Sequence, residues 1–203
     1  MRSSHAIAML MIVVGGACVG WYTFHPGPEV SVEKLGRVTP DFNLTDTAGR
    51  PRTLASYRGQ VVVLVFGFTF CPEACPTELF KLARVMKRLG SDADRVQVLM
   101  VTLDPERDSP EVLRRYVRAF DARFEALTGT AKQLRRAAQN FSVVYARVAI
   151  GDSYTIDHST AIYLIDPRGR HRSSEPMSTT VDELARRIQA LAAGQPTTPR
   201  PVV

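Results

Sequence analysis

The stretch VVVLVFGFTFCPEACP, residues 61–76, decides how we interpret this 203-residue chain. Residues 61–66 form a continuous apolar run, which is typical of a central strand buried on both faces of a sheet. Cys71 and Cys75 follow, and apolar residues at helical spacing then begin at Leu79. The stretch therefore predicts a thiol pair at a strand-to-helix junction, where it can perform redox chemistry or bind a soft metal ion.

Strands and helices alternate along the rest of the chain. Apolar runs predict further strands at 41–46, 96–101, 143–148 and 160–165. Further helices are predicted to begin at Ser109, Thr130 and Thr180, the last two with capping boxes completed by Gln133 and Glu183. This alternation predicts an α/β fold, with a central mixed sheet flanked by helices. Ligands of such sheets lie beyond the carboxyl ends of the strands, so we expect the cysteine loop near the site.

The N-terminal segment has a different character. Residues 6–24 contain no charged side chain, and this length can just span the hydrocarbon core of a membrane. We expect residues 1–25 to be a membrane anchor that leaves the rest of the chain outside the cytoplasm. A cleaved signal peptide and a lipid-modified Cys18 are the alternatives. The remaining divisions that we predict are a linker at 26–40, the folded domain at 41–192 and a disordered tail at 193–203.

The chain carries a formal net charge of +6, which suits an anionic membrane surface or an acidic partner. No basic cluster is interleaved with aromatic residues, so we expect no nucleic-acid partner. The first residues hold too few arginines and serines for a mitochondrial transit peptide. We therefore expect a single-pass protein of a bacterial inner membrane, with its domain in the periplasm or on the outer side.

The spacing of the two cysteines favours a chemical role over a structural one. A disulfide between Cys71 and Cys75 would close a very short loop and constrain little of the unfolded chain. The N–H groups at the start of a helix favour thiolate over thiol, which raises both nucleophilicity and metal affinity. A pair of buried, inert cysteines is the structural alternative. An exported domain also permits disulfides, so we expect the redox state of the pair to matter.

His158 directly precedes an apolar strand, far from the cysteines in sequence. Two thiolates and one imidazole would make a three-coordinate soft site, which suits copper(I) and tolerates copper(II), whereas structural zinc normally takes four protein ligands. A polar loop histidine without a ligand role is the alternative. Asp104 ends another buried strand, where its carboxylate could orient a histidine or tune a thiol. The sequence is equally compatible with a structural role, in which Asp104 and Asp108 only cap the turn and the next helix.

Together, three motifs resemble the Sco/SenC family of copper chaperones, and they stand at residues 66–76, 103–108 and 157–167. The resemblance covers about residues 38–192 and implies a thioredoxin-like fold. It also implies that copper binds to Cys71, Cys75 and His158, and that the protein serves the dinuclear copper centre of cytochrome c oxidase or another copper or thiol acceptor. Glu73 stands where the family often has Asp, and every metal-binding position is present.

Two functions of different classes remain open. A metallochaperone, which is not an enzyme in the strict sense, would pass copper to an acceptor by ligand exchange. A thiol–disulfide oxidoreductase would keep the cysteines of an acceptor reduced, and it needs Cys71 and Cys75 but not His158. A peroxidase is a weaker third possibility, because Phe68 occupies the position, three residues before Cys71, where peroxiredoxins carry Thr.

Overall fold

The computed structural model describes residues 40–195. The predicted anchor at 1–25 and the linker up to residue 39 lie outside this range, as do the last eight residues of the predicted tail. Within residues 40–195, no helix is long and apolar enough to cross a membrane.

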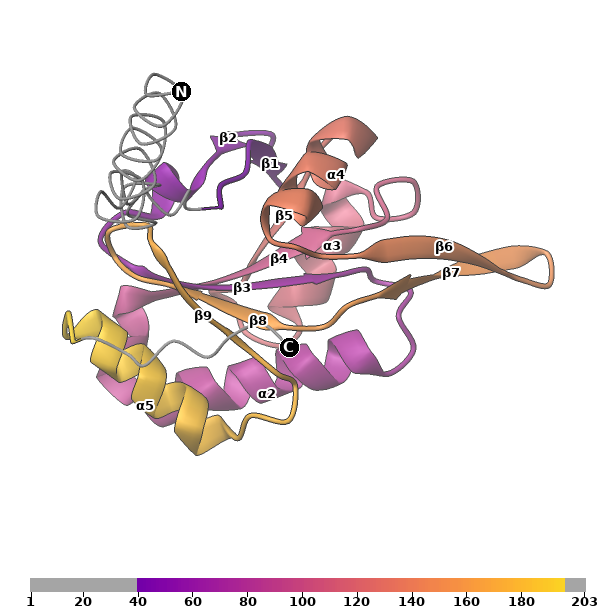
Figure 1. Cartoon of the computed structure of the whole chain (residues 1–203). Helices are drawn as coiled ribbons and strands as arrows, with labels where there is room; N and C mark the ends of the chain where they lie inside the picture. Colours follow the sequence, from indigo (N-terminus) through magenta and orange to yellow (C-terminus); the bar gives the residue numbers. More distant parts are fainter. Residues whose placement is uncertain (1–39, 196–203) are drawn as a thin grey trace, which may run out of the picture. The chain divides into compact units, whose positions relative to one another are not determined.

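A seven-stranded mixed sheet forms the centre of the fold (Figure 1). Its strands are β1 (Leu44–Asp46), β2 (Pro51–Arg52), β3 (Val61–Gly67), β4 (Val96–Thr102), β5 (Glu125–Thr128), β8 (Ile162–Ile165) and β9 (His171–Glu175), in the spatial order β2-β1-β5-β4-β3-β8-β9. β3, β4 and β5 are parallel, whereas β8 runs antiparallel to β3. The carboxyl end of β3 therefore lies beside the start of β8, where the chain arrives from His158.

Helices cover both faces of this sheet. They are α2 (Ala74–Leu89), α3 (Pro110–Arg118), α4 (Ala131–Asn140) and α5 (Val181–Ala192), with the 3-10 helices η2 (Leu54–Tyr57) and η3 (Gly90–Arg95). Alternate side chains of β3 enter two apolar layers, because successive residues of a strand point to opposite faces. α2, α3 and α5 close one layer, and α4 with η2 closes the other. This arrangement is thioredoxin-like, as predicted.

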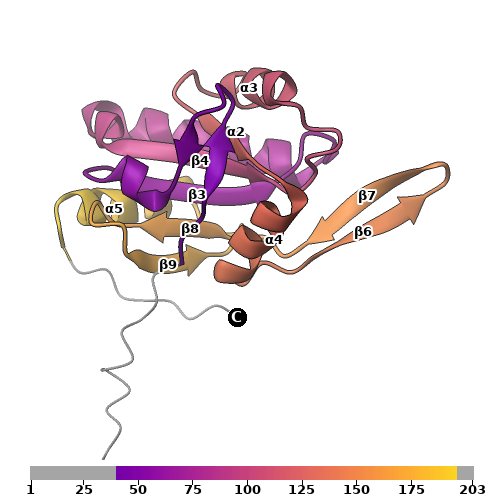
Figure 2. The ribbon, with the colours of Figure 1, turned by 90° about the horizontal axis from the view of Figure 1, so that it is seen from above.

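A two-stranded ribbon of β6 (Tyr145–Ile150) and β7 (Ser153–His158) stands apart from the main sheet and projects beyond it (Figure 2). We predicted a strand at 143–148 but treated the residues before Thr160 as a loop, so the sequence interpretation missed β7. His158 is the last residue of β7 and pairs with Tyr145 in the ribbon. The histidine is thus held at the base of a hairpin, where its backbone is fixed by strand pairing.

The predicted helix starts agree with the structure. The Ser109 hydroxyl accepts a hydrogen bond from the Val112 amide at 3.3 Å, and Thr130 and Gln133 form a complete capping box. Thr180 accepts a hydrogen bond from the Glu183 amide, but the Glu183 carboxylate pairs with arginines of its own helix instead of completing a box. Helix capping satisfies N–H groups that have no partner within the helix, which is why these starts are readable from sequence.

Candidate metal and thiol site

The thiol pair lies at the carboxyl end of β3, as the sequence predicted. Every residue of β3 is buried, and three residues separate the end of the strand at Gly67 from Cys71. Cys71 is half-buried in the loop before α2, and Cys75 is buried in the first turn of that helix. Both cysteines are free thiols in the structure.

Cys71 caps the start of α2 with its sulfur. The Cys75 amide donates a hydrogen bond to the Cys71 sulfur at an N–S distance of 3.3 Å. Amides in the first turn of a helix lack partners within the helix, so a sulfur placed there satisfies one of them. The same position lies at the positive end of the helix dipole, which favours negative charge on the Cys71 sulfur.

Cys75 differs from the expectation of an activated thiol. Burial raises the pKa of the Cys75 thiol to about 12, and a hydrogen bond and charge at the neighbouring Cys71 add to the increase, while the backbone at Phe68 partly opposes it. We expected the helix start to favour thiolate at both cysteines. At Cys75 the loss of solvation has a larger effect on the pKa than the helix dipole, because the sulfur lies among core residues.

The structure brings His158 to Cys75. Nε2 of His158 lies 4.0 Å from Sγ of Cys75, although 83 positions separate the two residues in sequence. Nδ1 of His158 lies 3.0 Å from the carbonyl oxygen of Ser159, which can only accept a hydrogen bond, so Nδ1 carries the proton. In the neutral imidazole Nε2 is then unprotonated, and its lone pair is free for a metal ion. The buried ring of Phe68 contacts the imidazole edge to face, with the ring centroids 6.2 Å apart.

These distances suit a metal ion between Cys75 and His158. With the bond lengths of zinc sites as a guide, about 2.3 Å to sulfur and about 2.0 Å to nitrogen, the two bonds together exceed the 4.0 Å separation. In residues 40–195, however, no three Cys, His, Asp or Glu side chains stand in an arrangement that could hold a metal ion. The structure thus brings two of the predicted ligands, Cys75 and His158, close together, and Cys71 would have to turn from its amide partner to join them as the third.

Gly67 provides the space that the Cys75 sulfur occupies. A Cβ atom at residue 67 would lie 2.8 Å from Sγ of Cys75 and 3.4 Å from Cε of Met100. The first distance is shorter than real Cβ contacts, so only glycine allows this approach without a shift. We predicted no role for Gly67 from the sequence, although its place immediately before the cysteine loop was the available signal.

Asp104 bonds to Arg107 and Tyr154, whereas the sequence allowed it either a role at the histidine or thiol or only a capping role. The carboxylate is buried and accepts hydrogen bonds from Nε of Arg107 at 2.5 Å and from the hydroxyl of Tyr154 at 2.9 Å. The partner of the imidazole Nδ1 is the carbonyl of Ser159. Asp104 acts on the site indirectly, because Tyr154 belongs to β7, the strand that ends at His158.

Arg107 strengthens this attachment of the ribbon. Its guanidinium lies over the ring of Tyr154 at 3.7 Å and over the ring of Phe70 at 4.7 Å, and Nη1 donates to the Tyr154 carbonyl at 2.9 Å. Cation–π contacts of this kind are worth about 0.5–2 kcal/mol each, depending on exposure. Arg107 therefore joins the ribbon to the loop that follows β4 and to the residue next to Cys71.

Asp108 holds the cysteine loop from the other side. The buried carboxylate accepts hydrogen bonds from the Thr69 amide at 3.2 Å, from the Thr69 hydroxyl at 2.5 Å and from the Thr102 hydroxyl at 2.6 Å. Burial raises the pKa of Asp108, and the hydrogen bonds from Thr102 and Thr69 partly oppose this shift. From the sequence Asp108 could be only a cap, whereas in the structure its carboxylate binds Thr69, two residues before Cys71.

One short loop, residues 104–108, thus binds both parts of the site. Asp108 at its end fixes Thr69, two residues before Cys71, and Asp104 at its start fixes Tyr154, four residues before His158. The loop is itself closed by a hydrogen bond from the Asp108 amide to the Asp104 carbonyl at 2.9 Å. Because both attachments belong to one closed turn, the spacing between the thiols and the imidazole depends on this loop.

Comparisons with known proteins show which proteins this chain resembles. The family model described as SCO1/SenC matches residues 30–193 of the chain. The mitochondrial SCO2 homologue of Mus musculus is 41% identical over 161 residues, which cover 74% of this chain and 62% of that protein. A SCO2-like protein of Rickettsia typhi is 38% identical over 173 residues, covering 81% of this chain and 85% of the relative. The chain spans 57–62% of the length of the mitochondrial relatives from mouse, human, cattle and zebrafish.

Among solved structures, ScoI of Bradyrhizobium japonicum with copper bound is similar in both sequence and shape. It superposes with a TM-score of 0.70 at 34% identity, and the match covers 76% of this chain and 99% of that structure.

Proposed function

Because the chain belongs to the SCO1/SenC family, we propose that it binds one copper ion through Cys71, Cys75 and His158 and passes it to an acceptor protein. The carrying observation is Nε2 of His158 at 4.0 Å from the Cys75 sulfur, with Nδ1 facing the Ser159 carbonyl. ScoI, a relative of 34% identity, was solved with copper bound, which supports the choice of metal. Sulfur and imidazole ligands also suit copper by their softness.

The proposed loading step changes the protonation of the site. Copper is the cargo here, and its binding replaces the proton on the Cys75 sulfur, because a thiolate and not a thiol is the metal ligand. The raised pKa of Cys75 makes the metal-free protein keep this proton at neutral pH. Cys71 gives up its hydrogen bond from the Cys75 amide and completes the site. Transfer would then proceed by exchange of these ligands for those of the acceptor.

For the acceptor, we propose the copper-bearing subunit of cytochrome c oxidase, which the Sco/SenC resemblance implies. We also propose that residues 1–25 anchor the chain in a bacterial inner membrane with the domain on the outer side. The uncharged stretch at 6–24 supports this topology, and a relative from a bacterium, Rickettsia typhi, supports the bacterial setting.

Reduction of an acceptor's thiols is the second candidate function. Its support is the difference between the two cysteines: Cys71 is half-buried and accepts a helix-start amide, whereas Cys75 is buried with a raised pKa. Cys71 would attack a disulfide of the acceptor and form a mixed disulfide, and Cys75 would then displace the acceptor thiol and leave the 71–75 pair oxidised. Both functions use the same sulfurs, but only the first requires the imidazole.

An anaerobic copper(I) titration tests the proposal. The reduced full chain in neutral detergent is titrated against a competing chelator, with Cys71→Ser, Cys75→Ser and His158→Ala alongside His171→Ala as the control histidine. We expect one copper per chain, a lower affinity in the first three variants and an unchanged affinity in the control. Disulfide exchange with a model substrate should survive in His158→Ala. An unchanged copper affinity in His158→Ala would show that the three-ligand site is wrong.

A further inference from the structure

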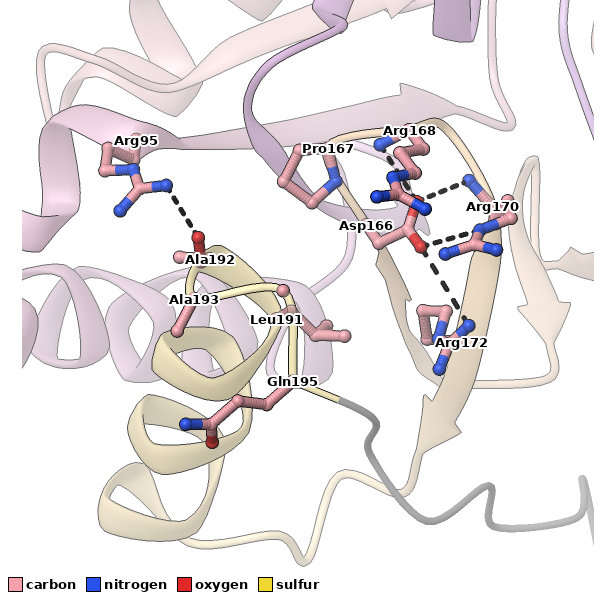
Figure 3. A pocket seen from close by; sticks show the side chains of 11 residues that line it. Arg95, Asp166, Pro167, Arg168, Arg170, Arg172, Leu191, Ala192, Ala193 and Gln195 are labelled. Carbon is pink, nitrogen blue, oxygen red and sulfur yellow. Dashed lines mark hydrogen bonds and ion pairs between the residues drawn. The ribbon is translucent and has the colours of Figure 1, made fainter.

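A second candidate site lies at the other end of the sheet. A cavity of about 430 Å³ opens between the turn that joins β8 to β9 and the C-terminal end of α5 (Figure 3). This volume is within the range of about 300–1,000 Å³ that small-molecule sites occupy. The charged side chains that line it are four arginines and a single aspartate: Arg95, Arg168, Arg170, Arg172 and Asp166.

Asp166 cannot neutralise these arginines, because the turn already uses its carboxylate. One oxygen accepts the amides of Arg168 and Arg170, at 2.9 and 3.0 Å. The other accepts Nε of Arg170 at 2.9 Å, and Nη1 of Arg172 lies 3.9 Å from it. The carboxylate therefore shapes the β8–β9 turn and balances one guanidinium. The remaining positive charge faces the cavity.

Arg58 adds a further guanidinium beside the cavity. It donates a hydrogen bond to the carbonyl of Arg168 and lies against Gly169, where a Cβ atom would come within 3.2 Å of its Cζ. Gly169 has a φ of +75°, so the turn needs glycine for its backbone as well as for this contact. Arg95 differs from the others, because it donates to the Ala192 carbonyl at 2.6 Å and so offsets the negative end of the α5 dipole.

We propose that this cavity binds a phosphate group, with Arg168 and Arg172 as its principal ligands and Arg58 and Arg170 beside them. Guanidinium groups present paired N–H donors that match two oxygens of a phosphate, and charge-assisted bonds of this kind are stronger than neutral ones. Arg168 is exposed at the turn, and the side chain of Arg172 is 24% exposed, so the two differ in depth along the cavity. Arg168 could therefore hold a ligand at the opening of the cavity, and Arg172 could hold it deeper inside.

The position of this cavity makes it independent of the thiol site. The Gly59 amide, just before β3, donates to the Pro167 carbonyl in the β8–β9 turn at 2.9 Å, whereas Cys71 follows the other end of β3. The seven residues of β3 separate the two ends by roughly 23 Å at about 3.3 Å per residue. The first described residues also lie at the end of the sheet that carries the cavity. Asp41 accepts a hydrogen bond from the Leu54 amide, and the helix η2, which begins at Leu54, leads directly to Arg58.

A phosphate could come from a lipid headgroup or from a soluble compound, and calorimetry on the full chain in a neutral, phosphate-free detergent distinguishes them. The probes are orthophosphate, glycerol phosphate and short-chain phosphatidylglycerol, with short-chain phosphatidylcholine as the zwitterionic lipid. The test variant is Arg168→Gln with Arg172→Gln. The matched control is Arg84→Gln with Arg115→Gln, which removes the same charge from exposed sites on α2 and α3.

We expect saturable binding of at least one phosphate probe with a dissociation constant below about 1 mM. The test variant should weaken it at least tenfold and the control less than twofold. Binding of orthophosphate or glycerol phosphate identifies a soluble ligand, and binding of phosphatidylglycerol alone identifies a lipid. No saturable binding, or an equal loss in both double variants, would overturn the proposal. Copper takes no part in the measurement, so this result is separate from the outcome of the copper titration.

Discussion

The substitution Gly67→Ala tests whether the position of Cys75 controls the site. The new Cβ atom would lie 2.8 Å from Sγ of Cys75, and ordinary contacts begin at 3.4 Å. To restore an ordinary contact, the sulfur, the strand or both have to move apart by 0.6 Å. Gly67 does not have a positive φ, so alanine is compatible with its backbone and the contact is the main perturbation.

The size of the effect follows from this overlap. Overpacking a core position by one methyl group typically costs about 1–3 kcal/mol of unfolding free energy. A displacement of 0.6 Å also exceeds the tolerance of about 0.5 Å within which functional groups must be held. If the same strain opposes copper binding between Cys75 and His158, copper(I) affinity falls about fivefold to a hundredfold, because 1.4 kcal/mol corresponds to a factor of ten.

Gly129→Ala is the matched control for this substitution. A Cβ atom there would lie 3.2 Å from Cδ2 of Leu44, so it also crowds the core, but it lies between β5 and α4 instead of beside a cysteine. Chemical denaturation measures the stability of both variants, and competition with a copper(I) chelator measures their affinity. We expect both to lose stability and only Gly67→Ala to lose affinity. If Gly67→Ala is destabilised yet binds copper like the wild type, our account of Cys75 is refuted.

Three further predictions concern the surroundings of the site. Burial raises the pKa of Asp108, so over a range of pH the folded chain keeps a proton that the unfolded chain has lost. The free energy of unfolding therefore falls as pH rises from about 3.8 through the folded pKa of this group. Asp108→Asn should remove this pH dependence, as measured by urea unfolding at a series of pH values. Tyr154→Phe removes the bond to Asp104 and should lower copper(I) affinity in the wild type but not in His158→Ala, and an equal loss in both backgrounds would exclude a positioning role. At pH 8, iodoacetamide should alkylate Cys71 before Cys75, since Cys75 is buried and its pKa is raised to about 12. Peptide mass spectrometry measures the order of labelling, and the reverse order would contradict the assigned environments.

The sequence allowed the central fold and the thiol pair to be predicted because both depend on local patterns. The apolar run of β3 is continuous, and the helix that follows carries apolar residues at regular spacing. Ser109 and Thr130 mark helix starts through hydrogen bonds that span only three residues. Features of this kind need no knowledge of which distant residues meet.

The elements that were missed owe their structure to distant partners. β9 contains no apolar residue and was not predicted, but it pairs with β8 at the edge of the sheet. β7 lies in a ribbon in which most residues of both strands are exposed or only partly buried. Neither strand therefore shows the alternation of apolar and polar residues that marks a strand with one buried face. The partners of Asp104 and Asp108 were also hidden, because Tyr154 and Thr69 stand 50 and 39 residues away.

The hydrogen bond from the Cys75 amide to the Cys71 sulfur makes the hydrogen exchange of this amide depend on the position of Cys71. If Cys71 turns away from this amide toward a metal ion or into a disulfide, the amide loses its sulfur acceptor to water. The exchange rate of this single amide proton should therefore rise on loading or oxidation, while amides deeper in α2 keep their protection. A measurement at one backbone position would then follow the occupancy of the site in a protein that carries no chromophore there.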